Sequence, residues 1–476
     1  MIDSIFPRRQ MLQTAACGFG SMAASALLAQ TNALPQTHQA AAGSDKSLPL
    51  APKAKRIIFL FMQGGVSQVD SFDYKPLLAK HDGQSYEFDD ARQLARSGKG
   101  RAFRLMQSPW KFNRYGESGR WVSDLFPETA RHADDMCLLH GMHTEGVAHG
   151  PATLFLHCGS TNFIRPSFGS WLLYGLGSEN ENLPGFISIA PSIGNGGARN
   201  YGSAFLPPRY QGTKVGGASS STMTIDSLTR DDIPHPLQQQ QFELLNRLNQ
   251  QQLAQRPLQD AELDAAMKSH ELAWRMQQFA PEALDLSSET AETIEMYGIN
   301  APETKRYGAR CLMARRMCEA GVRFIQVNYG DDSANPAWDQ HSNLPRHSTH
   351  ARAVDKPIAA LLTDLKQRGL LEDTIVWWGS EFGRTPYAQD NGTGRDHNPR
   401  GFTVWLAGGG FRGGHSHGET DEFGFRSIAG RVHMHDLHAT LLHQLGLDHK
   451  QLTFEHAGRN FRLTDVHGKI VTEILS

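Results

Sequence analysis

The residues best suited to chemistry are acidic side chains and histidines that occur together in short segments. Asp339 and His341 are separated by one residue, and Asp396 and His397 are adjacent. Glu381 directly follows an apolar run, so its side chain is expected to face a crevice. Imidazole and carboxylate groups bind hard and borderline divalent metals. The chain has 22 histidines, 5 cysteines and no Cys-x-x-Cys pair, which favours such a site over a thiolate site.

Each of these segments also has an interpretation without chemistry. Asp339 and His341 fit a helix cap beside a surface histidine, an interpretation favoured about two to one for an isolated pair. Asp396 and His397 fit a simple turn. The ordered recurrence of such segments along the chain nevertheless makes a metal site the favoured interpretation.

A further candidate, His149, lies in the histidine-rich segment 140–151. Pro151 suits the first turn of a helix predicted over residues 152–157. The N-terminus of that helix would favour an anion, with His149 beside it as a metal ligand or as an acid or base. A capping or core histidine fits equally well. Thr144, in the same segment, offers a hydroxyl nucleophile.

The elements that would position these residues follow a strand–helix pattern. Continuous apolar runs have the form of buried parallel strands at 56–62, 322–328, 374–379 and 402–407. Apolar residues at helical spacing predict helices over 303–320, 356–368 and 436–445. The alternation favours an α/β fold with a doubly wound, mostly parallel sheet flanked by helices.

The candidate residues occur where the predicted strands end, which is where open parallel sheets bind ligands. They follow the strands in this order: Gln63 and Asp70 after 56–62, Asp339 and His341 after 322–328, Glu381 after 374–379, and Asp396 and His397 before 402–407. We therefore expect these side chains to converge at one edge of the sheet.

The chain is predicted to consist of an export signal and one domain. Residues 1–40 have the parts of a twin-arginine signal peptide and linker, with Arg8 and Arg9 before a weakly apolar stretch. A membrane anchor would need about 20 consecutive apolar residues, and Gly, Ser and Gln interrupt this stretch. Residues 52–476 are predicted to form a single domain with a loop and helical excursion over 192–285. The expected location is the periplasm or the extracellular space.

The composition argues against two classes of partner. The formal net charge of −2 provides no concentrated basic face for a nucleic acid. No segment after the signal is long and apolar enough to span a bilayer. Cys311 and Cys318 have the spacing of core residues on one helix face, although a disulfide between any two cysteines stays possible in an oxidising compartment. The sequence does not indicate an oligomeric state.

Several longer motifs resemble the DUF1501 family of exported proteins, which belongs to the alkaline phosphatase/sulfatase-like superfamily. The resemblance covers essentially the whole mature chain and rests on these segments: FMQGGVSQVDSFDYKP (61–76), GMHTEGVAHGPA (141–152), AWDQHSNL (337–344), GSEFGRTP (379–386), GRDHNPRGFTVWLAGGGFRGG (394–414), HDLHATLLHQLGLDH (435–449) and GRNFRLTDVHGKIVTEIL (458–475). It implies an alkaline phosphatase-like domain with one or two metals at the carboxyl ends of the strands and a nucleophile at a helix N-terminus.

The resemblance assigns roles to individual residues and shows two departures. Asp339 with His341 is similar to the Asp-plus-His pair of the later metal site, and His397 is similar to the isolated late histidine. Gln63 stands where the first-strand carboxylate would be, and Phe382 stands where a histidine follows the central acidic residue, here Glu381. One metal position is therefore depleted unless Asp70 compensates. The CxPxR motif of formylglycine sulfatases is absent, and Thr144, His149 and Thr153 are the available nucleophiles.

The sequence therefore predicts an exported metal-dependent hydrolase of phosphate or sulfate esters, acting without formylglycine on a small-molecule or glycan ester. The ligands of the divalent ion, which could be zinc, calcium, magnesium or manganese, are expected to be Asp339, His341, Glu381, Asp396 and His397. Arg384 or Arg395 would clamp a non-bridging oxygen of the substrate. The alternative is a non-catalytic protein on the same fold that binds anionic glycans, and a structural scaffold is a weaker third possibility.

Overall fold

The first strand, β1 (Arg56–Met62), has seven consecutive buried residues, as its unbroken apolar sequence requires. In the computed structural model, the described residues are 50–89, 101–220, 223–226, 228–229, 232–254, 261–389 and 392–476. The segment 1–40, predicted to be an export signal, lies outside them. Residues 47–476 group into one unit.

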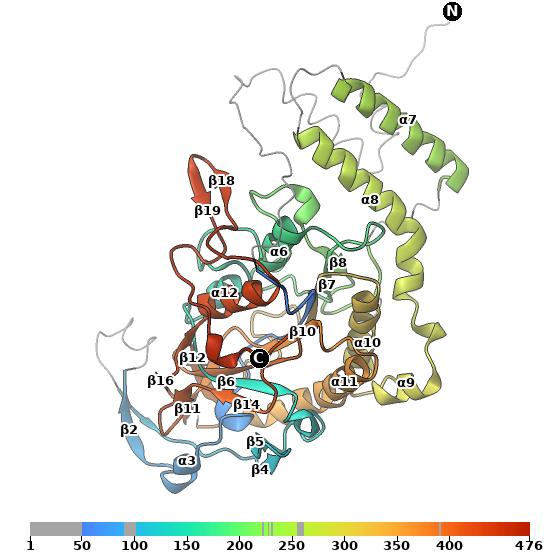
Figure 1. Ribbon diagram of the computed structural model, residues 1–476. Coiled ribbons are helices and arrows are strands. Elements are labelled where there is room, and N and C mark those ends of the chain that lie inside the picture. The colour runs from blue at the N-terminus through green and yellow to red at the C-terminus, as the bar shows by residue number, and fades with distance from the viewer. Residues whose placement is uncertain are drawn as a thin grey trace, which may run out of the picture. The chain divides into compact units, whose positions relative to one another are not determined.

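A large sheet organises this unit (Figure 1). Within the described residues it contains nine strands, in the order β14-β6-β13-β10-β1-β9-β7-β8, with β17 also paired to β6. The other strands of this sheet are β6 (Met136–His143), β7 (Phe186–Ile189), β8 (Thr213–Val215), β9 (Phe324–Tyr329), β10 (Thr374–Gly379), β13 (Phe402–Ala407), β14 (His415–His417) and β17 (Val432–His433). β1 pairs in parallel with both β10 and β9.

One strand runs against the others. β13 is antiparallel to β10 on one side and to β6 on the other, whereas the remaining pairs of the sheet are parallel. The sequence predicted a parallel strand at 402–407, so its position is right and its direction is wrong. Because β13 runs in the opposite direction, its beginning lies at the edge where its neighbours end. The loop before β13 therefore reaches the same edge as the loops after β1, β9 and β10.

Helices cover both faces of the sheet because the side chains of β1 alternate between two apolar clusters. Ile58, Leu60 and Met62 pack with α10 (Lys305–Glu319) and α11 (His347–Gln367). Ile57, Phe59 and Phe61 pack with α5 (His149–Cys158), α6 (Phe168–Leu176) and α12 (Met434–Gln444). The predicted doubly wound, mostly parallel α/β fold is confirmed. Cys311 and Cys318 lie in the first cluster, and the cysteines of the described residues are free and buried.

The predicted excursion over 192–285 is partly built into the sheet. It contributes β8 at the sheet edge, and then α7 (His235–Ala254) and α8 (Ala261–Leu284). Met276 and Ala280 of α8 join the apolar cluster beneath α10 and α11.

The remaining elements are short. The helices are α3 (Pro76–Lys80) and α9 (Ala291–Met296). The strands form two-stranded pairs: β2 (Ser85–Phe88) with β3 (Arg101–Arg104), β4 (Phe112–Tyr115) with β5 (Arg120–Ser123), β11 (Gly383–Ala388) with β12 (Arg395–Asn398), β15 (Glu419–Thr420) with β16 (Ser427–Ala429), and β18 (Phe454–His456) with β19 (Arg459–Phe461). No helix of the described residues is long and apolar enough to cross a membrane.

Candidate metal centre

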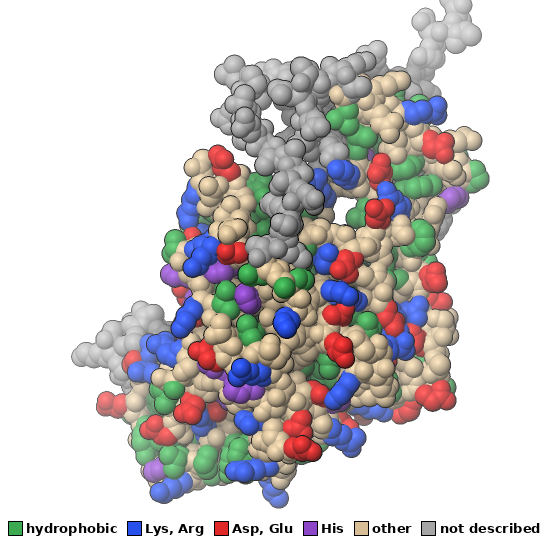
Figure 2. Space-filling view, in the orientation of Figure 1, with side chains coloured by type: hydrophobic (Ala, Val, Ile, Leu, Met, Phe, Trp, Pro, Cys, Tyr) green, Lys and Arg blue, Asp and Glu red, His purple; other side chains and the backbone are tan. Residues whose placement is uncertain are grey.

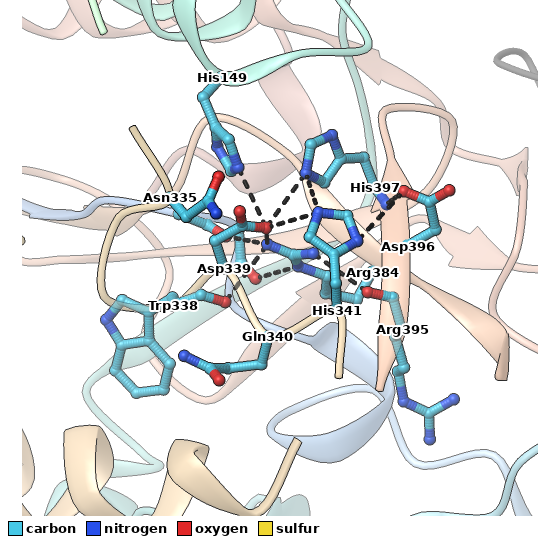
Figure 3. A network of polar contacts seen from close by, with 12 residues as sticks. His149, Asn335, Trp338, Asp339, Gln340, His341, Arg384, Arg395, Asp396 and His397 are labelled. Atoms are coloured by element: carbon cyan, nitrogen blue, oxygen red, sulfur yellow. Dashed lines mark hydrogen bonds and ion pairs between the residues drawn. The ribbon is translucent and has the colours of Figure 1, made fainter. Parts of the chain in front are cut away.

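The carboxylate of Asp339 lies at the centre of three histidines. Its Oδ1 atom is near the Nε2 atom of each ring: 3.1 Å from His149, 2.9 Å from His341 and 3.2 Å from His397. Nε2 of His341 and Nε2 of His397 are 3.0 Å apart. Figure 3 shows the three rings pointing toward the same carboxylate. One ligand atom from each of the four residues lies within 4.8 Å of every other.

Three distant parts of the chain supply these residues. His149 is the first residue of α5, Asp339 and His341 lie in the loop after β9, and His397 is in β12. The loop after β9 and the pair β11–β12 meet at the carboxyl edge of the sheet, because β11 follows β10 and β12 precedes the antiparallel β13. The sheet therefore brings together ligands that are up to 248 positions apart, from His149 to His397.

Gly64, just after β1, allows the Asp339 loop to approach the strand. Trp338 N donates a hydrogen bond to the carbonyl of Gln63 at 3.2 Å. A Cβ atom at Gly64 would lie 2.8 Å from the backbone nitrogens of both Trp338 and Asp339, and the φ angle of Gly64 is +119°. Only glycine combines that φ angle with so close a backbone contact.

The outer nitrogen of each imidazole is held by an oxygen that accepts hydrogen bonds. The pairs are His149 Nδ1 with Glu381 Oε1 at 2.7 Å, His397 Nδ1 with the Val147 carbonyl at 2.8 Å, and His341 Nδ1 with Gln389 Oε1. A neutral imidazole carries one N–H, so these bonds leave all three Nε2 atoms with lone pairs. The lone pairs face another acceptor, Asp339 Oδ1. This arrangement needs protons or a cation among the four atoms.

The spacing of the four atoms suits a metal ion. Ligand atoms about 2.0–2.1 Å from a tetrahedral zinc ion lie about 3.3 Å from one another. Four of the six separations, from 2.9 to 3.2 Å, come close to that value, and all six are at most 4.8 Å. His149 Nε2 is buried and makes no hydrogen bond to any described residue, which suits an atom that binds a cation. These residues therefore fit a divalent ion.

Glu381 lies behind His149, outside the group of four residues. Its side chain has no exposed surface, and its carboxylate accepts hydrogen bonds from Gly64 N at 2.9 and 3.0 Å and from Ser380 Oγ at 2.9 Å. Burial raises the pKa of Glu381, but the hydrogen bond and charge of His149 outweigh it, so the net pKa is lowered. The sequence predicted a direct ligand here. The structure instead places Glu381 where it orients a histidine from behind, a frequent arrangement in metal sites.

The protonation of the centre follows from burial opposed by hydrogen bonding. Burial raises the pKa of Asp339, but its close contacts with the three histidines and the charge of Arg384 outweigh it and hold the pKa well below its usual range. Burial lowers the pKa of His149, but Asp339 and Glu381 outweigh it and raise the pKa. For His397, burial dominates and lowers the pKa to about 4. Asp339 is therefore ionised at neutral pH, and His149 competes for a proton whenever no metal is bound.

Arg384 is a buried cross-link of the centre. Its guanidinium has no exposed surface and lies 2.6 Å from Asp339 Oδ1. It also donates to the carbonyls of Gly64, Gly65, Trp338 and Arg395. With its donors used by the protein, Arg384 does not fit the predicted role of clamping a substrate oxygen.

Asp70 and Arg395 form a separate buried ion pair. Arg395 Nε lies 2.7 Å from Asp70 Oδ2, and neither side chain is exposed. Asp70 also accepts a hydrogen bond from Ser67 Oγ. Asp70 therefore does not join the group of four, and Arg395, like Arg384, is unavailable to a substrate.

The other predicted residues surround the centre without entering the group of four. Gln63 is buried, and its backbone joins Tyr329 and Trp338. Asp396 Oδ1 accepts from the backbone of His397 at 2.8 Å and lies 3.6 Å from His341 Nδ1. Thr144 Oγ1 is buried and makes no hydrogen bond to a described residue.

Sequence reasoning missed the residues that hold the imidazoles from outside. Gln389 contacts His341, the Val147 carbonyl contacts His397, and Ser380 contacts Glu381. A glutamine or a backbone carbonyl carries no signal of this role in the sequence. Ser380 could have been found, because it stands next to Glu381 at the end of β10.

A family model matches residues 54–475 and is described as a protein of unknown function, DUF1501. The chain belongs to this family. The match spans every residue of the centre, so the group of four lies inside the part that defines the family. A comparison with curated proteins gives no match.

Solved structures similar to this DUF1501 chain include phosphatases and sulfatases at low identity. The alkaline phosphatase from the Antarctic bacterium TAB5 is 10% identical, with 83% of this chain and 98% of that chain covered and a TM-score of 0.34. A Pseudoalteromonas sp. sulfatase is 11% identical, with 83% and 68% covered and a TM-score of 0.35. The lipoteichoic acid synthase LtaP from Listeria monocytogenes is 9% identical, with 89% and 78% covered and a TM-score of 0.33.

Proposed function

We propose that this protein is a metal-dependent hydrolase of phosphate or sulfate esters, centred on His149, Asp339, His341 and His397. The observation that supports this proposal is that three Nε2 atoms with free lone pairs and one carboxylate oxygen all lie within 4.8 Å of one another. Three imidazoles and one carboxylate suit zinc or another first-row transition ion. Calcium and magnesium prefer sites made of oxygen ligands, so the donor set disfavours them.

A metal ion held there would polarise the ester and stabilise the charge that develops on its oxygens. The N-terminus of α5, where His149 is the first residue, supplies backbone N–H groups without partners inside the helix and thus favours an anion. A Cβ atom added at Gly150 would meet nothing within 4 Å, so this turn has open space beside it. The substrate oxygens would therefore lie against α5, since both nearby arginines are engaged.

His341 and Asp396 mark the open side of the centre. Their side chains are 27% and 19% exposed, whereas those of Asp339 and His397 are 2% and 5% exposed. Phe382 closes the inner side, with its ring 5.1 Å from that of His149 and 4.4 Å from that of His397. Substrate and water would enter from the His341 side, and Phe382 would exclude water from behind.

The test combines metal analysis with turnover. Purified protein is analysed for bound metals, and wild type, His341→Ala and the distant control His456→Ala are assayed against aryl phosphates and aryl sulfates. We expect about one transition metal ion per chain, with both metal and turnover lost in His341→Ala and kept in His456→Ala. Absence of metal together with absence of turnover across the panel would eliminate the proposal.

The second candidate function is binding of anionic glycans without catalysis. Two observations favour it. Among the described residues, no side-chain hydroxyl is hydrogen-bonded to a member of the group of four, so no nucleophile is in place. Gln63 and Phe382 stand where the resemblance implies metal ligands. A Glu381→Ala variant separates the two functions. Loss of turnover supports the hydrolase, whereas glycan binding without turnover in both forms supports the binding protein.

We further propose that residues 1–40 direct export by the twin-arginine route to the periplasm or beyond. A folded domain whose metal ligands come from distant parts of the chain suits that route. The proposal rests on Arg8 and Arg9 in the sequence. Fusing residues 1–40 to a reporter that folds in the cytoplasm tests it, because Arg8→Lys with Arg9→Lys should abolish export of the reporter.

A further inference from the structure

A polar cavity lies away from the group of four residues, beside the edge strand β14. Its volume is about 910 Å³. Five stretches of the chain line it, and they include Arg120, His140, Arg412, His415, His417, Glu419, Gly430 and Glu473. Figure 2 shows histidine and basic side chains together on the surface over the region of β14. A volume of this size accommodates a ligand of drug or disaccharide size.

The charged groups of the cavity are not paired with one another. Arg120 and Arg412 contribute two positive charges, and Glu419 and Glu473 contribute two negative charges. Within the described residues, none of the four forms an ion pair with an N···O distance of 4 Å or less. Opposite charges left apart in one cavity are available to a ligand that both donates and accepts hydrogen bonds.

The hydrogen bonds of the two arginines leave donors unused. Arg120 donates to Ser416 Oγ at 2.8 Å, and its buried Nε makes no hydrogen bond to a described residue. Arg412 donates from Nε to the Leu475 carbonyl at 2.7 Å, which fixes the guanidinium against the C-terminal turn. Each guanidinium is thus held in place by one hydrogen bond and keeps further N–H groups for a ligand.

Two imidazoles of the cavity, those of His140 and His415, are kept neutral. Burial lowers the pKa of His140 and of His415, and for His415 the charges of Arg412, His417 and Arg120 lower it further. A neutral imidazole has one donor and one acceptor. Nδ1 of His140 contacts Thr403 Oγ1 at 3.3 Å, so His140 has only Nε2 left for a ligand. The histidines and carboxylates of the cavity are not spaced closely enough to hold a metal ion together. Among the described residues, only His149, Asp339, His341 and His397 form such a group, with ligand atoms within 4.8 Å of one another.

We propose that this cavity binds an oligosaccharide through its ring hydroxyls. Vicinal hydroxyls accept from guanidiniums and donate to carboxylates, which matches the unpaired groups of both signs. The balanced charge argues against a ligand recognised by sulfate or phosphate alone. This site is independent of the metal centre and of the hydrolase proposal.

The test uses an array of immobilised neutral hexasaccharides (gluco-, manno-, galacto- and xylo-configured) and their sulfated forms, read with the full-length mature protein. We expect binding to at least one neutral hexasaccharide. The dissociation constant should rise at least about tenfold in Arg412→Ala and in Glu473→Gln, because each change removes a charged hydrogen-bonding group. The matched surface controls Arg131→Ala and Glu455→Gln should bind as wild type does.

Three results would overturn the proposal: no binding to any neutral sugar, binding that survives both cavity variants, or binding that requires sulfate and is unchanged in Glu473→Gln. Thermal unfolding of each variant checks that it folds. An Asp339→Asn variant separates this proposal from the previous one, because it should keep glycan binding while losing metal.

Discussion

His149 Nδ1 lies 2.7 Å from Oε1 of Glu381, a carboxylate with no exposed surface. This contact determines which nitrogen of His149 carries the proton. An ionised carboxylate can only accept a hydrogen bond, so the proton is on Nδ1. The lone pair of Nε2 then points toward the other ligands. A residue outside the group of four thus controls the metal-binding form of one inside it.

The first prediction concerns this contact. Glu381→Gln keeps the size of the side chain but removes the charge that holds the Nδ1 proton, so the affinity for zinc should fall about 10- to 100-fold. Competition with a chromophoric chelator measures the affinity. The exposed Glu372→Gln is the matched control and should leave it unchanged. Equal affinity in Glu381→Gln and wild type would show that Glu381 does not orient the ligand.

The second prediction concerns Gly64, which contacts the Asp339 loop but offers no side chain to a metal. Gly64→Ala places a Cβ atom 2.8 Å from backbone nitrogens of that loop, so we expect weaker zinc binding and lower stability. Gly83→Ala is the matched control: its φ is also positive, +77°, but a Cβ there meets nothing within 4 Å. Gly83→Ala should cost only about 1–2 kcal/mol and leave zinc affinity intact. Equal effects of the two variants on zinc affinity would contradict the prediction.

The fold and the location of the centre could be predicted because they depend on local patterns. The apolar runs of β1 and β10 predicted buried strands with the bounds found in the structure. The rule that ligands gather at the carboxyl ends of parallel strands then placed Asp339, His341 and His397 near one another. These inferences need only the alternation of apolar runs and loops.

The division of roles among charged residues could not be predicted, because it depends on distant partners. Asp70 and Glu381 both follow apolar strands, yet one pairs with Arg395 and the other with His149. Arg384 has the sequence context of a substrate-binding arginine, but it points back to Asp339 and to four carbonyls. The direction of β13 relative to its neighbours could not be predicted either, because a short apolar run fits a parallel and an antiparallel strand equally well.

The third prediction concerns Arg384. Arg384→Ala removes a buried cation from beside Asp339 and leaves buried carbonyls without donors, so the free energy of unfolding should fall by about 3–5 kcal/mol. Urea denaturation in the presence of a chelator measures this loss without a contribution from bound metal. The exposed Arg131→Ala should change it by less than about 0.5 kcal/mol. Unchanged stability with lost turnover would instead make Arg384 a substrate-binding residue.

The fourth prediction is acid lability caused by buried histidines away from the metal centre. Burial lowers the pKa of His143, His157 and His438 to about 4 each, and that of His435 to about 2. In the unfolded chain a histidine has a pKa of about 6.5, so the unfolded state binds more protons below that pH. The contribution of these neutral histidines to the free energy of unfolding is fully present above about pH 7. It is lost progressively as the pH falls from about 6.5 toward 4, and the total loss is on the order of several kcal/mol.

The opposite contribution comes from Asp355, whose pKa burial raises to about 6. Its protonation in the folded state adds stability as the pH falls from about 6 toward 4. Burial also raises the pKa of Asp421, so two carboxyls oppose the four histidines. Urea denaturation of chelator-treated protein between pH 4 and 7.5 measures the sum. We expect the free energy of unfolding to decrease toward acid, and the decrease to be smaller in His435→Phe, which cannot take up a proton. A free energy of unfolding that stays constant or rises toward pH 4 would mean that these histidines are protonated in the folded protein.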